Sequence, residues 1–85
     1  MEAYVLVEIS ADSDMYGQGR TVIEKMRKIP GVETAELLFG DYDAIIKLNM
    51  PKIHEVENLV IEEISMIEGV RNTITLLCVD EEILR

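Results

Sequence analysis

Two aspartates lie close together in the segment FGDYDAII, residues 39–46. Asp41 and Asp43 flank Tyr42 between two apolar runs. Carboxylates are suited to hold an ammonium group, because a charged donor forms its strongest hydrogen bonds with an ionised acceptor. Asp and Gly are also favoured in turns, where they serve the chain itself. The segment is therefore both a candidate ligand site and a candidate turn, and the two interpretations do not exclude each other.

Other residues that could do chemistry have no evident chemical partners in the sequence. His54 is the only histidine and lies in a predicted helix, and Cys78 is the only cysteine, near the end of an apolar strand. No Cys-x-x-Cys or His-x-x-x-His pair supports a zinc site. The glycine-rich segment 16–19 could cradle an anion, but it lacks a Walker lysine and the dinucleotide pattern. We expect no catalytic residue, no metal and no cofactor, and an enzyme is the least favoured class.

The length and charge of the chain limit its partners. Eighty-five residues allow one domain, 1–85, which would be marginal as a monomer and so favours homo-oligomerisation. The net charge is −9 and the eight Lys and Arg residues are scattered, so direct nucleic-acid binding is not expected. No apolar run approaches the roughly 18 residues of a membrane span. The absence of a basic leader and the lone cysteine predict a reducing, cytoplasmic location.

The periodicity of apolar residues predicts six elements around these candidates. Alternating residues predict strands, and apolar residues three and four apart predict amphipathic helices. A turn-rich segment, 11–19, contains Asp12, Ser13 and Asp14 as possible helix caps. The GDYD residues, 40–43, are expected to form a hairpin loop. The expected strands are 3–10, 32–39, 44–50 and 70–79, and the expected helices are 17–28 and a second one that begins at Pro51 and stops at Gly69.

A weak internal repeat supports this order. Segments 29–38 and 67–76 share the pattern Ile-x-Gly-Val followed by a strand, and each ends a predicted helix. Two such halves in the order β-α-β-β-α-β predict an α+β, ferredoxin-like sandwich. In that fold a four-stranded antiparallel sheet carries two helices on one face.

The second face of this sheet is also apolar. An open sheet normally exposes a polar face to water, and a large apolar face predicts an interface. We expect a sheet-to-sheet homodimer, which would add the core that a small monomer lacks. The residues predicted on that face are Tyr4, Leu6, Leu38, Ile45 and Leu77.

Several short motifs, taken together, resemble the ligand-binding (RAM) domain of the Lrp/AsnC, or feast/famine, family of amino-acid-responsive transcription regulators. The segment 5–9 is similar to the opening strand of that domain, and Gly40, Tyr42 and Asp43 resemble its G-x-Y-D loop. Thr73 and Thr75 resemble the T-x-T of its last strand. The resemblance covers residues 3–79. The family's N-terminal helix-turn-helix domain is not found before the first strand, so the chain looks like a stand-alone RAM domain.

This resemblance implies a function as well as a fold. Family members pair through their sheets, often assemble into rings of eight chains, and bind an amino acid between neighbouring dimers. The implied ligand-binding residues are Gly40, Asp41, Tyr42, Asp43, Thr73 and Thr75. The carboxylates would bind the ammonium, with Asp43 favoured, and backbone N–H groups or threonine hydroxyls would bind the carboxylate.

The implied role is an amino-acid sensor that modulates transcription alone or with a full-length Lrp/AsnC regulator. Two alternatives stay open. One is a purely structural oligomerisation module. The other is an ACT-type regulatory domain, which shares the element order but usually places its glycine-bearing ligand loop after the first strand, where Gly17 and Gly19 are weak matches.

Overall fold

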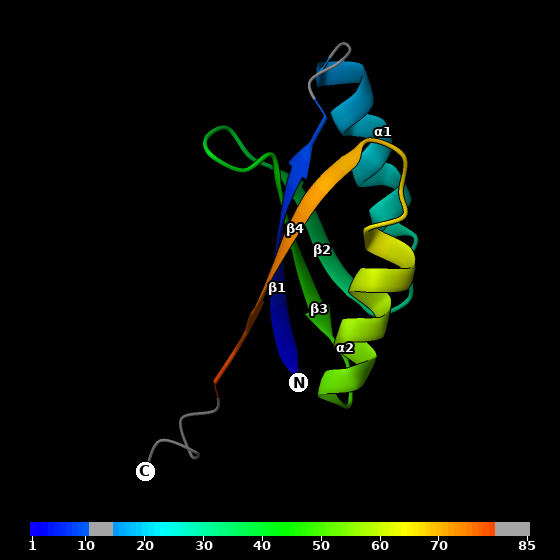
Figure 1. The fold of residues 1–85 in the computed structure, drawn as a ribbon, viewed down its shortest axis with the longest axis vertical. Coiled ribbons are helices and arrows are strands. Elements are labelled where there is room, and N and C mark those ends of the chain that lie inside the picture. Colours follow the sequence, from blue (N-terminus) through cyan, green and yellow to red (C-terminus); the bar gives the residue numbers. More distant parts are fainter. Residues whose placement is uncertain (11–14, 80–85) are drawn as a thin grey trace.

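The computed structural model describes residues 1–10 and 15–79, and its elements follow the predicted order (Figure 1). The possible caps at 12–14 lie outside the described residues, as does the tail from residue 80. The strands are β1 (Glu2–Ile9), β2 (Val32–Leu37), β3 (Ala44–Asn49) and β4 (Val70–Leu77). The helices are α1 (Met15–Arg27) and α2 (Ile53–Leu59), which continues into the π-helical segment η1 (Val60–Ile64).

The four strands form one antiparallel sheet in the order β2-β3-β1-β4. The central strand β1 pairs with β3 on one side and β4 on the other, so that Val5 lies opposite both Ile46 and Thr75. Both helices lie on one face of this sheet, as Figure 1 shows. The predicted ferredoxin-like sandwich is therefore confirmed.

The core lies between the sheet and the two helices. Alternate residues of β1 and β3 point into it, as the period-two pattern predicts. The helices contribute residues three and four apart, which form the apolar stripe of each helix. Among the described residues, the buried apolar ones are Ala3, Val5, Val7, Ile9, Val22, Ile23, Met26, Ala35, Ala44, Ile46, Leu48, Val56, Leu59, Val60 and Ile64.

The two Ile-x-Gly-Val repeats form the same turn. The Val32 N–H donates to the Ile29 carbonyl at 3.1 Å, and the Val70 N–H donates to the Ile67 carbonyl at 3.0 Å. The glycines inside the two turns have φ values of 99° and 100°. Only glycine adopts this conformation at little cost. The sequence repeat therefore corresponds to one type of turn, which connects each helix to the strand that follows it.

Most element boundaries differ from the prediction by one or two residues, and the second helix, with its π-helical part, ends at Ile64, well before Gly69. The strand β2 ends at Leu37 instead of Phe39, and one further hydrogen bond, from the Leu38 N–H to the Asp43 carbonyl at 2.8 Å, closes the hairpin. Helix α2 begins at Ile53, two residues after Pro51. Its last part is π-helical, and the Ser65 N–H donates to the Val60 carbonyl at 2.8 Å.

The outer face of the sheet, which the helices leave open, carries five apolar side chains. Tyr4, Leu6 and Ile45 lie on it as predicted, because their strand neighbours alternate into the core. The predicted position of Leu77 is wrong. Leu77 lies opposite the buried Ala3 and so belongs to the helix side of the sheet. The outer positions of β4 are instead filled by Ile74 and Leu76, which lie opposite Leu6 and Tyr4.

Leu38 directly follows β2 and is 41% exposed. None of the described helices combines the length and apolarity that crossing a membrane requires.

Candidate ligand-binding site

The hairpin loop between β2 and β3 consists of residues 38–43. It projects from the sheet on the side away from the helices (Figure 1). Phe39 stands fully in solvent at the start of the loop. Gly40 has a φ of 154°, and a side chain added there would meet no atom within 4 Å. The loop therefore presents an apolar ring and open backbone to any molecule that approaches from outside the chain.

Asp43 anchors the second end of this loop to the central strand. Its backbone N–H donates to the Val7 carbonyl at 2.8 Å, and its side-chain Oδ2 accepts a hydrogen bond from the Ile9 N–H at 2.7 Å. Asp43 is half-buried. The carboxylate thus has a structural role through a contact with β1 that the sequence did not indicate. The second oxygen, Oδ1, has no protein partner among the described residues.

Asp41 is different. Its side chain is exposed, and it forms no hydrogen bond or ion pair with the described part of the chain. Tyr42, between the two aspartates, is half-buried. One carboxylate of the pair is therefore held in place and the other is free in solvent.

The two threonines do not meet this loop within one chain. Thr73 lies opposite Val7 and Thr75 opposite Val5, so both belong to the edge strand β4 on its helix side. The strand β1 separates them from the Asp43 end of the loop. Two strand spacings amount to about 10 Å, which is too far for one small ligand group to bridge directly. A single chain therefore brings together Gly40, Asp41, Tyr42 and Asp43, but not these four with Thr73 and Thr75.

A cluster of charges lies on the outer face of the sheet. The Lys47 Nζ is 3.6 Å from Glu2 Oε1 and 3.7 Å from Glu33 Oε2. The carboxylate of Glu2 raises the pKa of Lys47 above 10.5, with further contributions from Tyr4 and Glu33. The ammonium is thereby neutralised by its own chain beside the apolar residues of that face.

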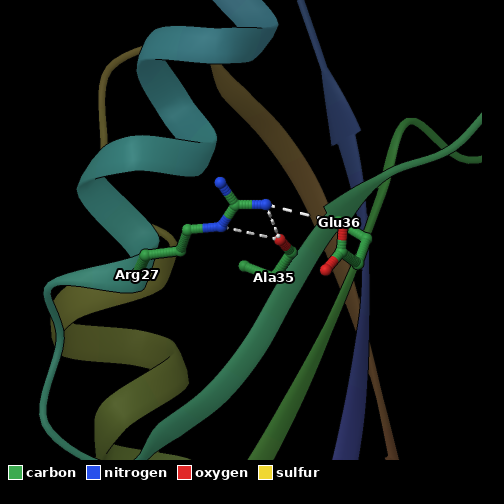
Figure 2. Close-up of polar contacts among 3 residues, drawn as sticks. All are labelled: Arg27, Ala35 and Glu36. Carbon is green, nitrogen blue, oxygen red and sulfur yellow. Dashed lines mark hydrogen bonds and ion pairs between the residues drawn. The ribbon is translucent and has the colours of Figure 1, made fainter.

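A second group of charged residues lies where α1 crosses the edge strand β2. A cavity of about 330 Å³ is lined there by Arg20, Ile23, Glu24, Arg27, Glu36 and Leu37. Figure 2 shows that the Arg27 guanidinium reaches from α1 to the strand, where Nε and Nη2 donate to the Ala35 carbonyl at 3.0 and 2.8 Å. Nη2 also lies 3.5 Å from the Glu36 carboxylate. The sequence gives little indication of this contact. It shows only that Arg20 and Arg27 are seven residues apart, and so lie on the same side of α1.

Another cavity, of about 300 Å³, lies beside α2 and η1, and its walls include Pro30, Met50, Leu59 and three glutamates. It contains none of the predicted ligand residues. Among the residues that the structure describes, no group of three or more His, Cys, Asp or Glu side chains could hold a metal ion.

Comparison with known proteins places these features in a family. The family model described as the Lrp/AsnC ligand binding domain matches residues 2–84. An uncharacterized HTH-type transcriptional regulator of Pyrococcus abyssi is 32% identical over 78 residues, which are 92% of this chain and 51% of that protein. The chain thus spans about half the length of the curated regulators that it matches. A homocitrate synthase of Sulfurisphaera tokodaii is 32% identical over 72 residues, or 85% of this chain and 15% of the enzyme.

Solved structures show the same architecture. A hypothetical protein from Pyrococcus horikoshii matches with a TM-score of 0.79 and 25% identity, over 93% of this chain and 89% of that one. A transcriptional regulator from Neisseria meningitidis, solved as a complex with L-Met, matches with a TM-score of 0.75 and 19% identity, over 94% of this chain and 50% of that one. The second likeness is one of fold alone. From its family match and its relatives, the chain belongs to the Lrp/AsnC ligand-binding domain family.

Proposed function

We propose that this chain is a regulatory domain that binds a free amino acid at a site completed only when chains assemble. The observation that carries the proposal is the division of the ligand-binding groups. The hairpin loop holds both carboxylates, and the two threonines lie on the far side of β1. A loop that projects from one chain can meet the donors of another, so assembly would unite the two halves of the site.

The chemistry of the two halves suits an amino acid. The α-ammonium requires an ionised acceptor, and we assign the closer contact to Asp43. Its carboxylate is already held by the Ile9 N–H, so little conformational freedom is lost on binding. Asp41 is the second acceptor. The threonine hydroxyls and the loop N–H groups near Gly40 are the donors for the α-carboxylate.

The outer face of the sheet is the proposed dimer interface. It combines the apolar row of β1, β3 and β4 with Lys47, whose charge is offset by Glu2 and Glu33. Leu38, predicted for this interface, lies at the hairpin beside that face. Higher assembly, for which eight chains is the family's common number, would then bring the hairpin loops against neighbouring dimers. Leu77 lies on the helix side of the sheet and is not part of this interface.

Coupling between ligand and assembly follows from this arrangement. A ligand that binds only the complete site stabilises the assembled state and shifts the equilibrium toward it. The Pyrococcus relative is named as an HTH-type transcriptional regulator, and the Neisseria structure as a complex with L-Met. These names support an amino acid as the effector and transcription as the process modulated, with a full-length family member as the partner.

Calorimetry with each of the twenty amino acids tests the proposal. At least one should bind, and Asp43→Asn should weaken its binding by tenfold or more, roughly the value of a charged hydrogen bond. Asp41→Asn should weaken it less. Glu57→Gln, on the exposed side of α2, is the matched control and should bind like the wild type. If no amino acid binds at millimolar concentration, the proposal fails.

A purely structural oligomerisation module is the competing function. It uses the hairpin loop as a turn only, a role that Asp43 already fills. Such a module would have one mass by light scattering with and without every amino acid. A ligand-dependent change in mass excludes it.

A further inference from the structure

Strand β2 is an edge of the sheet, and its hydrogen-bonding row on the side away from β3 faces no other strand of the described chain. Edge strands of this kind pair readily with strands of other molecules unless something prevents it. Five of the six residues of β2 are exposed or half-exposed, and the segment continues into the exposed Leu38 and Phe39. The length and apolar end of β2 therefore make it a candidate for unwanted pairing.

Ala35, in the middle of β2, is the exception. Its side chain is only 1% exposed because it belongs to the core, as does that of Ile46 opposite. Its carbonyl is covered from α1, where the forked guanidinium of Arg27 donates two hydrogen bonds to it (Figure 2). In an antiparallel strand the N–H and carbonyl of one residue point to the same side, so Arg27 occupies the place where a pairing strand would bond.

We propose that Arg27 blocks pairing of β2 with the β2 strand of a second copy, and so directs self-association to other surfaces. The expected occupant of an uncovered edge is a second copy because the strand is self-complementary. In an antiparallel pair centred on Ala35, Thr34 of one copy lies opposite Glu36 of the other, and Glu33 lies opposite Leu37. Neither pair opposes like charges, so the sequence of β2 does not itself prevent the contact.

A second protection exists only at the start of the strand. The pairing register of β2 shifts between Val32 and Thr34, and such irregularities weaken an edge as a template. From Thr34 to Leu37 the ladder between β2 and β3 is regular. Arg27 therefore blocks the part of β2 that would otherwise be a regular template for pairing. This inference does not depend on amino-acid binding.

Light scattering over a range of protein concentrations tests it with Arg27→Ala. The variant should form additional, larger species at concentrations at least tenfold lower than the wild type. Arg20→Ala is the matched control: it removes another arginine of α1 that lines the same cavity but forms no hydrogen bond or ion pair with the described residues of β2, and it should behave as the wild type. If Arg27→Ala is folded by circular dichroism and keeps the wild-type mass throughout, the proposal is overturned.

Two further variants complete the test. One examines the pairing register of the two β2 strands, and the other is a substitute for Arg27→Ala if that variant does not fold. Adding Thr34→Glu to Arg27→Ala places glutamates opposite each other twice in the symmetric pair, so it should restore the wild-type mass. Association undiminished in this double variant would contradict pairing through β2. If Arg27→Ala does not fold, Arg27→Gln replaces it. This variant loses the forked contact and the charge, and should show the same increase to a smaller degree. An unchanged mass in folded Arg27→Gln would then overturn the proposal.

Discussion

The Asp43 Oδ2 atom accepts a hydrogen bond of 2.7 Å from the backbone N–H of Ile9, 34 residues earlier in the chain. The Asp43 N–H also donates to the Val7 carbonyl. Asp43 therefore continues the pairing of β1 with β3 beyond Val7 and Ala44, the last residue pair of the two strands. This contact fixes the end of the hairpin loop to the central strand and determines where the loop can present a carboxylate.

Replacing Asp43 should separate its structural role from its charge. Asp43→Ala leaves the Ile9 N–H without its acceptor and should lower the free energy of unfolding by about 1–3 kcal/mol. Asp43→Asn keeps an oxygen acceptor and should lower it less. Urea denaturation of both variants measures the difference. Equal effects of the two substitutions would show that the hydrogen bond is not what stabilises the loop.

Gly31→Ala should destabilise the fold strongly. The residue has a φ of 99°, and an added Cβ would collide with the Met50 sulfur and approach Leu59 at 3.2 Å. Backbone strain alone costs of order 1–3 kcal/mol, and the collision adds to it. Gly40→Ala is the control, because its φ is also positive but the space around it is open. Thermal unfolding should show a larger decrease in melting temperature for Gly31→Ala than for Gly40→Ala. If Gly31→Ala lowers the melting temperature less than Gly40→Ala does, the packing of Met50 and Leu59 against Gly31 is contradicted.

Leu6→Lys should disrupt the proposed dimer. Leu6 lies in the middle of the outer face, between Ile45 and Ile74, and a lysine there would bury a charge without a partner. The expected result is a mass by sedimentation close to that of one chain. Ile61→Lys changes an exposed apolar residue of η1 and should leave the mass unchanged. If Leu6→Lys retains the wild-type mass, the chains do not associate through this face.

The Lys47 cluster should make stability depend on pH in the alkaline range. The pKa of Lys47 is raised above 10.5 in the folded chain, chiefly by Glu2. A raised pKa means that the lysine's contribution to stability is complete below pH 10.5 and is lost as the pH rises through the folded pKa. The wild type should therefore be more stable than Lys47→Met below pH 10.5, and the difference should shrink above it. Urea denaturation midpoints of both proteins, measured below and above that pH, test this expectation. A difference between wild type and Lys47→Met that grows as the pH rises would contradict the raised pKa of Lys47.

Most of the fold could be predicted from periodicity. The alternation in β1 and β3 identified both the strands and their buried faces, because one side of each strand packs on the helices. The assignment of Leu77 failed because Leu76 and Leu77 are adjacent and both apolar, so the sequence does not say which faces outward. The register of β4 decides it, and that register includes a shift at Glu8 and Ile9.

Contacts between distant residues could not be predicted in the same way. The hydrogen bond from Ile9 to Asp43 and the contact from Arg27 to Ala35 depend on how elements meet in space. The motif predicts a ligand-binding role for Asp43, which stays a prediction, but the hydrogen bond from Ile9 to its side chain left no signal in the sequence. The placement of Thr73 and Thr75 across β1 likewise follows from strand order, and it explains why one chain holds only part of the proposed site.

The most direct test of the account is the mass of the purified chain, measured by multi-angle light scattering with and without the amino acid that binds best. A site completed by assembly requires that the ligand change the distribution of oligomers, and that Asp43→Asn remove the change while leaving the ligand-free mass as it is. A mass that is the same with and without a bound amino acid would contradict the central claim.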